Sequence, residues 1–254
     1  MTAPLDALAA LPGVFEAVEA ARGATDGLLR DLMRPELRSR VAEVGAEGLR
    51  RGAWASAVLE GAPGEQDAFH PAFPDDAHAA LRHAALRVTT EVAGLAAVWQ
   101  RAPLQAMARL ASLAGAGLAP DAELGRPRPD PQVSSRLAAL AETVTAPGRT
   151  PAVVVAAVVH GELLALAPFV VANGLVARAS SRLALLAGGL DPKGVTIPEV
   201  GHLELGADAY AQALDGYRSG DPDGLAAWVG HCAQATALGA RAARRVAAEL
   251  TASD

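Results

Sequence analysis

One stretch near the middle of the chain, residues 160–178, gathers side chains that could do chemistry. His160 and Glu162 could exchange protons with a bound molecule. Asn173 and Arg178 lie at an expected helix start, where free backbone N–H groups favour an anion. The combination indicates either acid–base chemistry or the binding of a phosphate group.

Motifs of other enzyme and metal sites are absent from the sequence. It has no Walker-type phosphate loop, no serine nucleophile elbow and no His-x3-His pair. His78 and His83 are five residues apart and do not share a helical face, which argues against a zinc site. The single cysteine, Cys232, excludes an internal disulfide, and its apolar neighbours predict a small buried residue. We expect no metal ion and no other cofactor.

Helices are predicted to position these residues. Hydrophobic residues make up 51% of the chain but aromatic residues only 4%, so alanine, leucine and valine dominate, which suits close-packed helices. The fold class is therefore all-α. Periodicity and helix-start signals predict helices over residues 76–101, 103–115, 133–144, 151–166 and 175–186, and one that starts at 221–222. Residues 120–131 are too rich in proline for a helix, and 195–205 is the best place for short extended structure.

Several helix boundaries carry explicit signals. Asp75 can cap the helix that follows it, and Thr150 can cap the next buried helix, with Pro151 at its first position. Helices in the first 62 residues are expected to break at Gly23 and at 34–35. We divide the chain into an N-terminal helical region, residues 1–64, and a core, residues 65–254.

The charge and hydropathy of the chain disfavour several classes of partner and a place in the membrane. The net charge of -6 disfavours a nucleic acid or an anionic membrane surface as a partner. Residues 151–171 are long and apolar, but His160 and Glu162 lie in the middle, which favours a buried helix over a membrane span. The first residues lack the features of a signal peptide, and with one cysteine we expect a cytoplasmic protein.

Residues 160–178 resemble the signature of the Fic (Fido-domain) family, His-Pro-Phe-x-Asp/Glu-Gly-Asn-Gly-Arg-x-x-Arg with a histidine seven residues upstream. His160 stands at the upstream position. The residues that match the signature are Pro168, Phe169, Asn173, Gly174 and Arg178, and those that depart from it are Ala167, Val171, Ala172 and Leu175. The resemblance covers about residues 75–235 and implies a Fic-like helical domain. It also places a flap, which could be a short β-hairpin, at residues 125–131.

The resemblance implies transfer of AMP from ATP to a protein hydroxyl, and the departures argue against that reaction. The family's general base is replaced by Ala167, its magnesium ligand by Val171 and its first phosphate-binding arginine by Leu175. Ala172 replaces a glycine, which costs about 1 kcal/mol if the position needs a positive φ. We therefore expect no catalytic residue here and no productive binding of ATP and magnesium.

A second motif, Ser/Thr-x-x-x-Glu-Gly/Asn, resembles the family's inhibitory helix. Ser56, Glu60 and Gly61 match it. In the family the glutamate pairs with the second motif arginine, so we expect an ion pair between Glu60 and Arg178. This pair is either a retained switch or a purely structural contact. Asn173, Gly174 and Arg178 could still bind an anion, although a helix cap by Asn173 is the simpler interpretation.

Three functions remain open. The first is a Fic-fold pseudoenzyme that binds a protein partner or a nucleotide. The second is an enzyme with altered phosphate-group transfer, which would draw on Glu60, His160, Glu162 and Arg178 and on the flap residues Arg126 and Arg128. The third is a helical protein whose role is assembly into a homodimer or larger homo-oligomer. A carboxylate or imidazole facing an open pocket near Asn173 would favour the second.

Overall fold

A computed structural model describes residues 4–64, 78–146 and 150–252. Within these ranges the chain forms α-helices, two short 3-10 helices and no strand, so the predicted all-α class is confirmed. The α-helices are α1 (Pro4–Ala9), α2 (Val14–Leu32), α3 (Val41–Leu59), α4 (Ala79–Trp99), α5 (Pro103–Gly115), α6 (Pro131–Thr145), α7 (Ala152–Leu166), α8 (Asn173–Ala187), α9 (Pro198–Leu205), α10 (Ala207–Ser219) and α11 (Pro222–Ala252).

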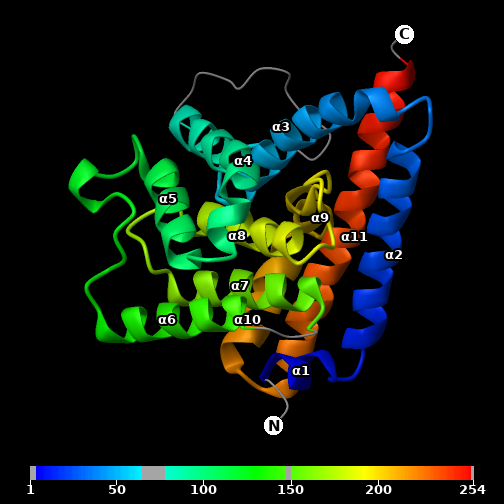
Figure 1. Cartoon of the computed structure of the whole chain (residues 1–254). Helices are drawn as coiled ribbons and strands as arrows, with labels where there is room; N and C mark the ends of the chain where they lie inside the picture. The colour runs from blue at the N-terminus through cyan, green and yellow to red at the C-terminus, as the bar shows by residue number, and fades with distance from the viewer. Residues whose placement is uncertain (1–3, 65–77, 147–149, 253–254) are drawn as a thin grey trace.

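Helices α7 and α8 lie at the centre of the molecule, with α5, α6, α10 and α11 around them (Figure 1). The sequence of α7 explains this position, since Glu162 is its only charged residue and apolar side chains cover all of its faces. A helix of that kind is stable in water only when other helices cover it. The prediction of a central, buried helix is confirmed by the burial of Val154, Ala157, Val159 and Leu163, each with no exposed surface.

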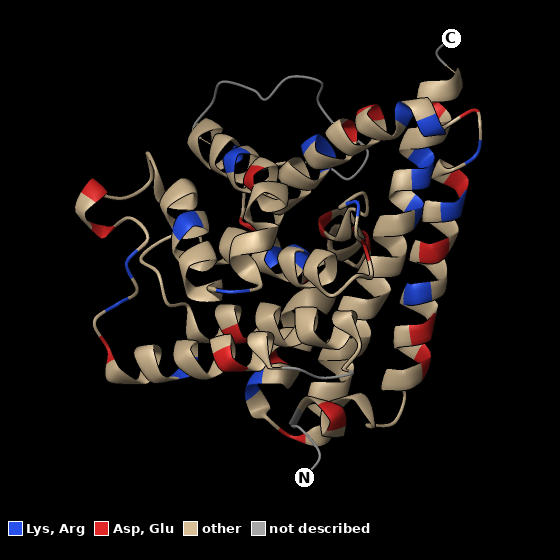
Figure 2. Ribbon diagram, in the orientation of Figure 1, with Lys and Arg blue, Asp and Glu red and all other residues tan. Residues whose placement is uncertain are grey.

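The long helix α11 lies beside α2 along one edge of the fold (Figure 1). Acidic and basic side chains are interspersed along α2, whereas α7 carries one charged residue, Glu162, and α8 carries two, Arg178 and Arg182 (Figure 2). Leu28 and Leu32 of α2 bury their side chains against α3, α11 and the segment before α9, where Ile197 is fully buried. The N-terminal helices thus share apolar cores with the helices that follow them.

Four local predictions were wrong. Residues 195–205 are not extended, because Pro198 begins α9, a position where proline's missing N–H costs nothing. Helix α2 continues through Gly23, since packing against α11 outweighs the ~1 kcal/mol helix penalty of one glycine. Thr150 does not cap α7, as its hydroxyl donates to Asp6 at 2.8 Å. In place of a β-hairpin, residues 125–130 have a turn and irregular backbone, and Pro131 begins α6.

The remaining sequence predictions concern boundaries and a membrane span. Helices α5 and α11 begin at Pro103 and Pro222 as predicted, and the break near residues 34–35 is confirmed. Two predictions fall on residues 65–77, which are outside the described residues: the helix cap by Asp75 and the start of the core at residue 65. No helix in the described ranges has the length and apolarity needed to cross a membrane.

Candidate functional site

The segment that connects α7 to α8, residues 167–172, is called the motif loop below. Ala167 ends α7 with φ 44° and Ala172 precedes α8 with φ 56°. Among the described residues these are the only two outside glycine with a positive φ. The left-handed conformation costs an L-residue about 1–2 kcal/mol. Position 172 therefore does need a positive φ, and glycine would adopt this conformation at a lower free-energy cost than alanine.

Asn173 closes the motif loop on itself. Its side-chain Oδ1 accepts a hydrogen bond from the Phe169 N–H at 2.9 Å, and its Nδ2 donates to the Phe169 carbonyl at 2.7 Å. The N-cap position of α8 belongs to Ala172, which has no capping side chain. The predicted helix cap by Asn173 is therefore wrong. The amide instead uses its oxygen and one N–H to fix the shape of the loop before the helix starts.

Arg128, on the segment predicted as a flap, also binds the end of α7 and the motif loop. The Arg128 guanidinium donates to the Ala167 carbonyl at 3.0 Å and to the Leu166 carbonyl at 2.9 Å. The Arg128 backbone N–H donates to the Pro168 carbonyl at 2.8 Å. Arg128 thereby satisfies carbonyl groups at the end of α7 that have no partner within the helix. Arg126 remains exposed beside it.

Arg178 on α8 is bound by the C-terminal end of α3. Its Nε donates to the Ser56 hydroxyl at 2.7 Å, and its Nη2 donates both to the Ser56 carbonyl and to Glu60 Oε2, each at 2.9 Å. The other Glu60 oxygen accepts from the Gly174 N–H at 3.3 Å. Only 2% of the Arg178 side chain and 22% of the Glu60 side chain are exposed. The ion pair expected between them is present.

Gly61 and Gly174 make this approach of α3 to α8 possible. Gly61 has φ 100°, a conformation suited to glycine, and turns the chain away directly after Glu60. A Cβ atom on Gly174 would lie 2.0 Å from Glu60 Oε2. Because that separation is impossible, the carboxylate can sit against the start of α8 only when residue 174 is glycine.

The residues of the motif loop do not fit a magnesium–nucleotide complex. Ala167, Val171 and Leu175 offer no proton acceptor, metal ligand or phosphate donor, and Leu175 is buried with 1% exposure. The backbone N–H of Gly174 and the guanidinium of Arg178 already bind the Glu60 carboxylate. An entering phosphate would therefore meet a carboxylate and apolar side chains, which cannot replace its lost hydration.

His160 and Glu162, the other candidates for chemistry, are occupied by contacts within the protein. His160 has no exposed surface, and its Nε2 lies 2.6 Å from the Tyr210 hydroxyl. Burial, and then the charge of Arg178, hold the pKa of His160 well below its ordinary value. Glu162 accepts two hydrogen bonds from Arg136, at 2.7 and 2.8 Å. The interpretation of His160 as a core histidine with a satisfied ring nitrogen is confirmed.

A cavity of about 710 Å³ lies elsewhere. Its lining includes Trp99, Thr145, Val155 and Ala184 and none of the motif residues. It therefore gives no open pocket in which Glu162 or His160 could act near Asn173.

Sequence reasoning missed a group of histidines around Cys232. Cys232 is buried on α11, as predicted, but His202 on α9 and His231 on α11 were not connected to it. His202 Nδ1 lies 3.1 Å from His231 Nε2, and one donor atom each from His160, His202 and Cys232 lies within 4.8 Å of the others. No spacing rule could have found this group, since its members lie on three separate helices.

Comparison with known proteins places this geometry in a described fold. No protein-family model matches the sequence, and no curated protein matches it. Solved structures do match. A Fic family protein from Desulfovibrio desulfuricans G20 gives a TM-score of 0.70 at 15% identity, covering 90% of this chain and 74% of that one. Fic-1 from C. elegans gives 0.68 at 16% identity, covering 90% and 71%.

The chain is thus an all-α protein with a Fic-like fold. Identities of 15% and 16% establish the fold alone. The motif loop, the Arg178 contacts and the proline-rich segment lie on that fold, and what they do has to be argued from their own chemistry.

Proposed function

We propose that this protein is a Fic-fold pseudoenzyme, which acts by binding another protein and does not transfer AMP. One observation carries the proposal. The start of α8, where the fold would receive a phosphate, is bound by the protein's own Glu60 carboxylate, and the adjacent loop offers no catalytic group.

Loss of three functions at once supports the absence of catalysis. Ala167 cannot take a proton from a hydroxyl, Val171 cannot bind a metal ion and Leu175 cannot neutralise a phosphate oxygen. General base catalysis alone contributes about 10²–10⁴-fold to a rate, and metal neutralisation adds a further large factor. A neighbouring side chain could replace one of these groups, but His160 and Glu162 are both engaged within the protein.

Binding of a protein partner is supported by what the loop exposes. Val170 at the tip of the motif loop is 48% exposed, and the exposed Arg126 and Arg128 lie on the segment beside it. The contacts of Arg128 and Asn173 hold this surface in one conformation. A preorganised loop loses little conformational entropy when a partner binds. In this proposal, Glu60 at the end of α3 occupies the start of α8 and excludes anions from it.

The absence of AMP transfer is tested with labelled ATP and magnesium. Glu60→Gly removes the internal carboxylate, and we expect no label on the protein or on lysate proteins for either the wild type or the variant. A labelled band in Glu60→Gly that disappears when Arg178→Ala is added would overturn the proposal.

Calorimetry with a panel of nucleotides, with and without magnesium, separates protein binding from nucleotide binding. We expect no heat of binding for the wild type, for Glu60→Gly or for the matched variant Glu60→Gln. Micromolar binding that strengthens in Glu60→Gly would contradict protein binding as the sole role and would assign a nucleotide to the start of α8. Val170→Asp then tests the surface directly, because a partner that binds there should be lost from this variant.

A further inference from the structure

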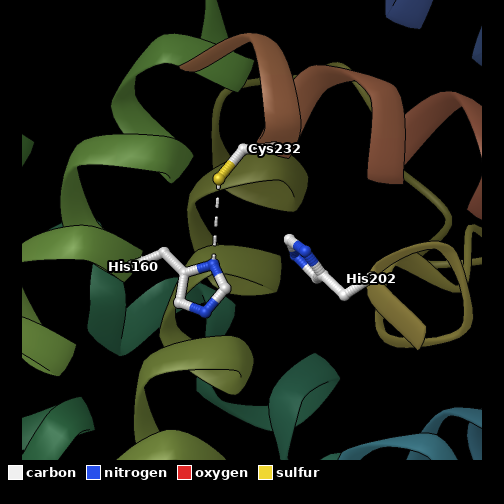
Figure 3. Close-up of side chains that lie close together, drawn as sticks. All are labelled: His160, His202 and Cys232. Atoms are coloured by element: carbon white, nitrogen blue, oxygen red, sulfur yellow. Dashed lines mark hydrogen bonds between the residues drawn. The ribbon is translucent and has the colours of Figure 1, made fainter. Parts of the chain in front are cut away.

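Three side chains with metal-binding atoms meet where α7, α9 and α11 come together (Figure 3). His160, His202 and Cys232 point toward one another in this view, and they are 0%, 3% and 5% exposed. Cys232 Sγ lies 4.0 Å from His160 Nδ1, and one donor atom from each of the three lies within 4.8 Å of the other two.

We propose that His160, His202 and Cys232 bind one thiophilic d¹⁰ metal ion, Zn²⁺ or Cu⁺, in a closed site inside the helical core. One thiolate and two imidazoles are ligands that both ions prefer. This inference does not depend on the proposed function, since none of the three residues takes part in the motif loop.

The distances are close to those a bound ion requires. Metal–nitrogen bonds of about 2.0 Å and metal–sulfur bonds of about 2.3 Å place neighbouring ligand atoms about 3.5 Å apart. The sulfur and the His160 nitrogen, at 4.0 Å, need to approach by about 0.5 Å. The widest pair of donor atoms is at most 4.8 Å apart and needs to approach by up to about 1.3 Å, which rotation of the three side chains can supply. On binding, the Cys232 thiol releases its proton to solvent and the sulfur forms the bond to the metal.

Outer hydrogen bonds already orient both imidazoles. The Tyr210 hydroxyl lies 2.6 Å from His160 Nε2, which leaves the Nδ1 atom facing the sulfur. His202 Nδ1 lies 3.1 Å from His231 Nε2. Metal-binding histidines commonly use their second ring nitrogen in this way, and the partner fixes the ring and its tautomer. Tyr210 and His231 therefore give the cluster the second layer of support found around metal ions in proteins.

The charge and the number of ligands distinguish Cu⁺ from Zn²⁺ as the ion of this site. One thiolate neutralises Cu⁺, and three ligands satisfy that ion. Zn²⁺ keeps one net positive charge near Arg178 and prefers a fourth ligand, which these three residues do not supply. Because His231 orients His202, His231→Ala should weaken the binding of either ion by about 10–100-fold, and competition between Zn²⁺ and Cu⁺ for the metal-free protein identifies the ion that the site takes.

The test uses metal-free full-length protein, prepared with a chelator and a reductant. Co²⁺ serves as the spectroscopic probe for the Zn²⁺ site, and Cu⁺ is titrated anaerobically against a chromophoric chelator. We expect one equivalent of metal, a thiolate-to-cobalt charge-transfer band in the near-ultraviolet, and a Tm rise of about 5–10 °C at a free Zn²⁺ concentration 100 times Kd. Cys232→Ser should weaken binding by at least about 100-fold, since even second-layer residues contribute 10–100-fold.

His83→Gln, which changes an exposed histidine on α4, is the matched control and should bind as the wild type does. If neither Co²⁺, Zn²⁺ nor Cu⁺ binds with one-to-one stoichiometry, the proposal is wrong. Equal affinity of the wild type and a folded Cys232→Ser also overturns it. Should Cys232→Ser fail to fold, the wild-type cobalt spectrum decides, because Cys232 is the only cysteine and a thiolate band can come from no other residue. A spectrum without that band overturns the proposal.

Discussion

Replacement of Glu60 by glutamine tests the contact between α3 and α8 most directly. Glutamine keeps the shape of the side chain and one acceptor oxygen but removes the negative charge opposite Arg178. The guanidinium would remain 2% exposed, bound by the Ser56 hydroxyl and carbonyl oxygens and close to the Tyr210 hydroxyl, with no anionic partner. The protein would then bury a cation without its counter-ion.

The expected loss follows from the burial of the two partners. Removing one partner of a fully buried ion pair costs about 3–5 kcal/mol, and a hydrogen bond to a charged group contributes about 1.5–3 kcal/mol. The 22% exposure of Glu60 and the bonds that Ser56 retains place this case at the lower end. We expect a loss of about 2 kcal/mol in the free energy of unfolding, or a Tm lower by about 4–8 °C.

Denaturant unfolding monitored by circular dichroism measures this loss. Glu43→Gln on the same helix is the control: its side chain is 59% exposed and lies 4.0 Å from Arg40, so its effect should stay within about 0.5 kcal/mol. A double-mutant cycle of Glu60→Gln with Arg178→Met should give a coupling energy of about 2 kcal/mol that persists in 1 M salt. A loss in Glu60→Gln no larger than in the control would refute the reasoning.

Three further predictions concern the loop and helix α3. Ala172→Gly should stabilise the protein by about 0.5–1 kcal/mol by relieving a left-handed alanine, whereas Ala184→Gly inside α8 should destabilise it by at least about 1 kcal/mol; thermal unfolding compares them. Asn173→Ala should cost about 2 kcal/mol and speed amide exchange in the motif loop, because it removes both bonds that close the loop; exchange rates equal to wild type would contradict this. Burial would raise the pKa of Glu47, but hydrogen bonds from Arg50 and Arg51 hold this pKa below its ordinary value of 4.5. The ionised Glu47 therefore stabilises the folded protein above pH 4.5, and this stabilisation is lost as the pH falls below that value. Glu47→Gln should therefore lose less stability than wild type between about pH 5 and pH 3, measured by denaturant unfolding.

Helix starts were predictable where proline marks them. Pro103 and Pro222 begin α5 and α11, since the proline ring fixes a helical φ and its missing N–H is not needed there. The same signal at Pro198 was overlooked because the β-branched residues before it, Val195 to Ile197, favoured an extended reading. Gly23 was read as a helix break although α2 gains its stability from packing on α11, which no local rule records.

Contacts between distant residues were predictable only where a motif linked them. Glu60 and Arg178 are 118 residues apart, and their pairing was expected solely from the resemblance to a known signature. His202 and His160 have no such link. Their approach depends on how α9 packs on α11, which a single sequence does not encode in any short pattern. The two groups are nevertheless neighbours, because the Tyr210 hydroxyl that contacts His160 also lies within the influence of the Arg178 charge.

The shape of the motif loop is set by hydrogen bonds in which its apolar side chains take no part. Asn173 binds the backbone of Phe169, Arg128 binds backbone carbonyls, and the Glu60 carboxylate binds the backbone of Gly174 as well as Arg178. None of these bonds involves the side chain at position 167, 171 or 175, so apolar side chains at these three positions leave the loop's hydrogen bonds intact. The shape of this loop therefore depends on other groups than the side chains at positions 167, 171 and 175.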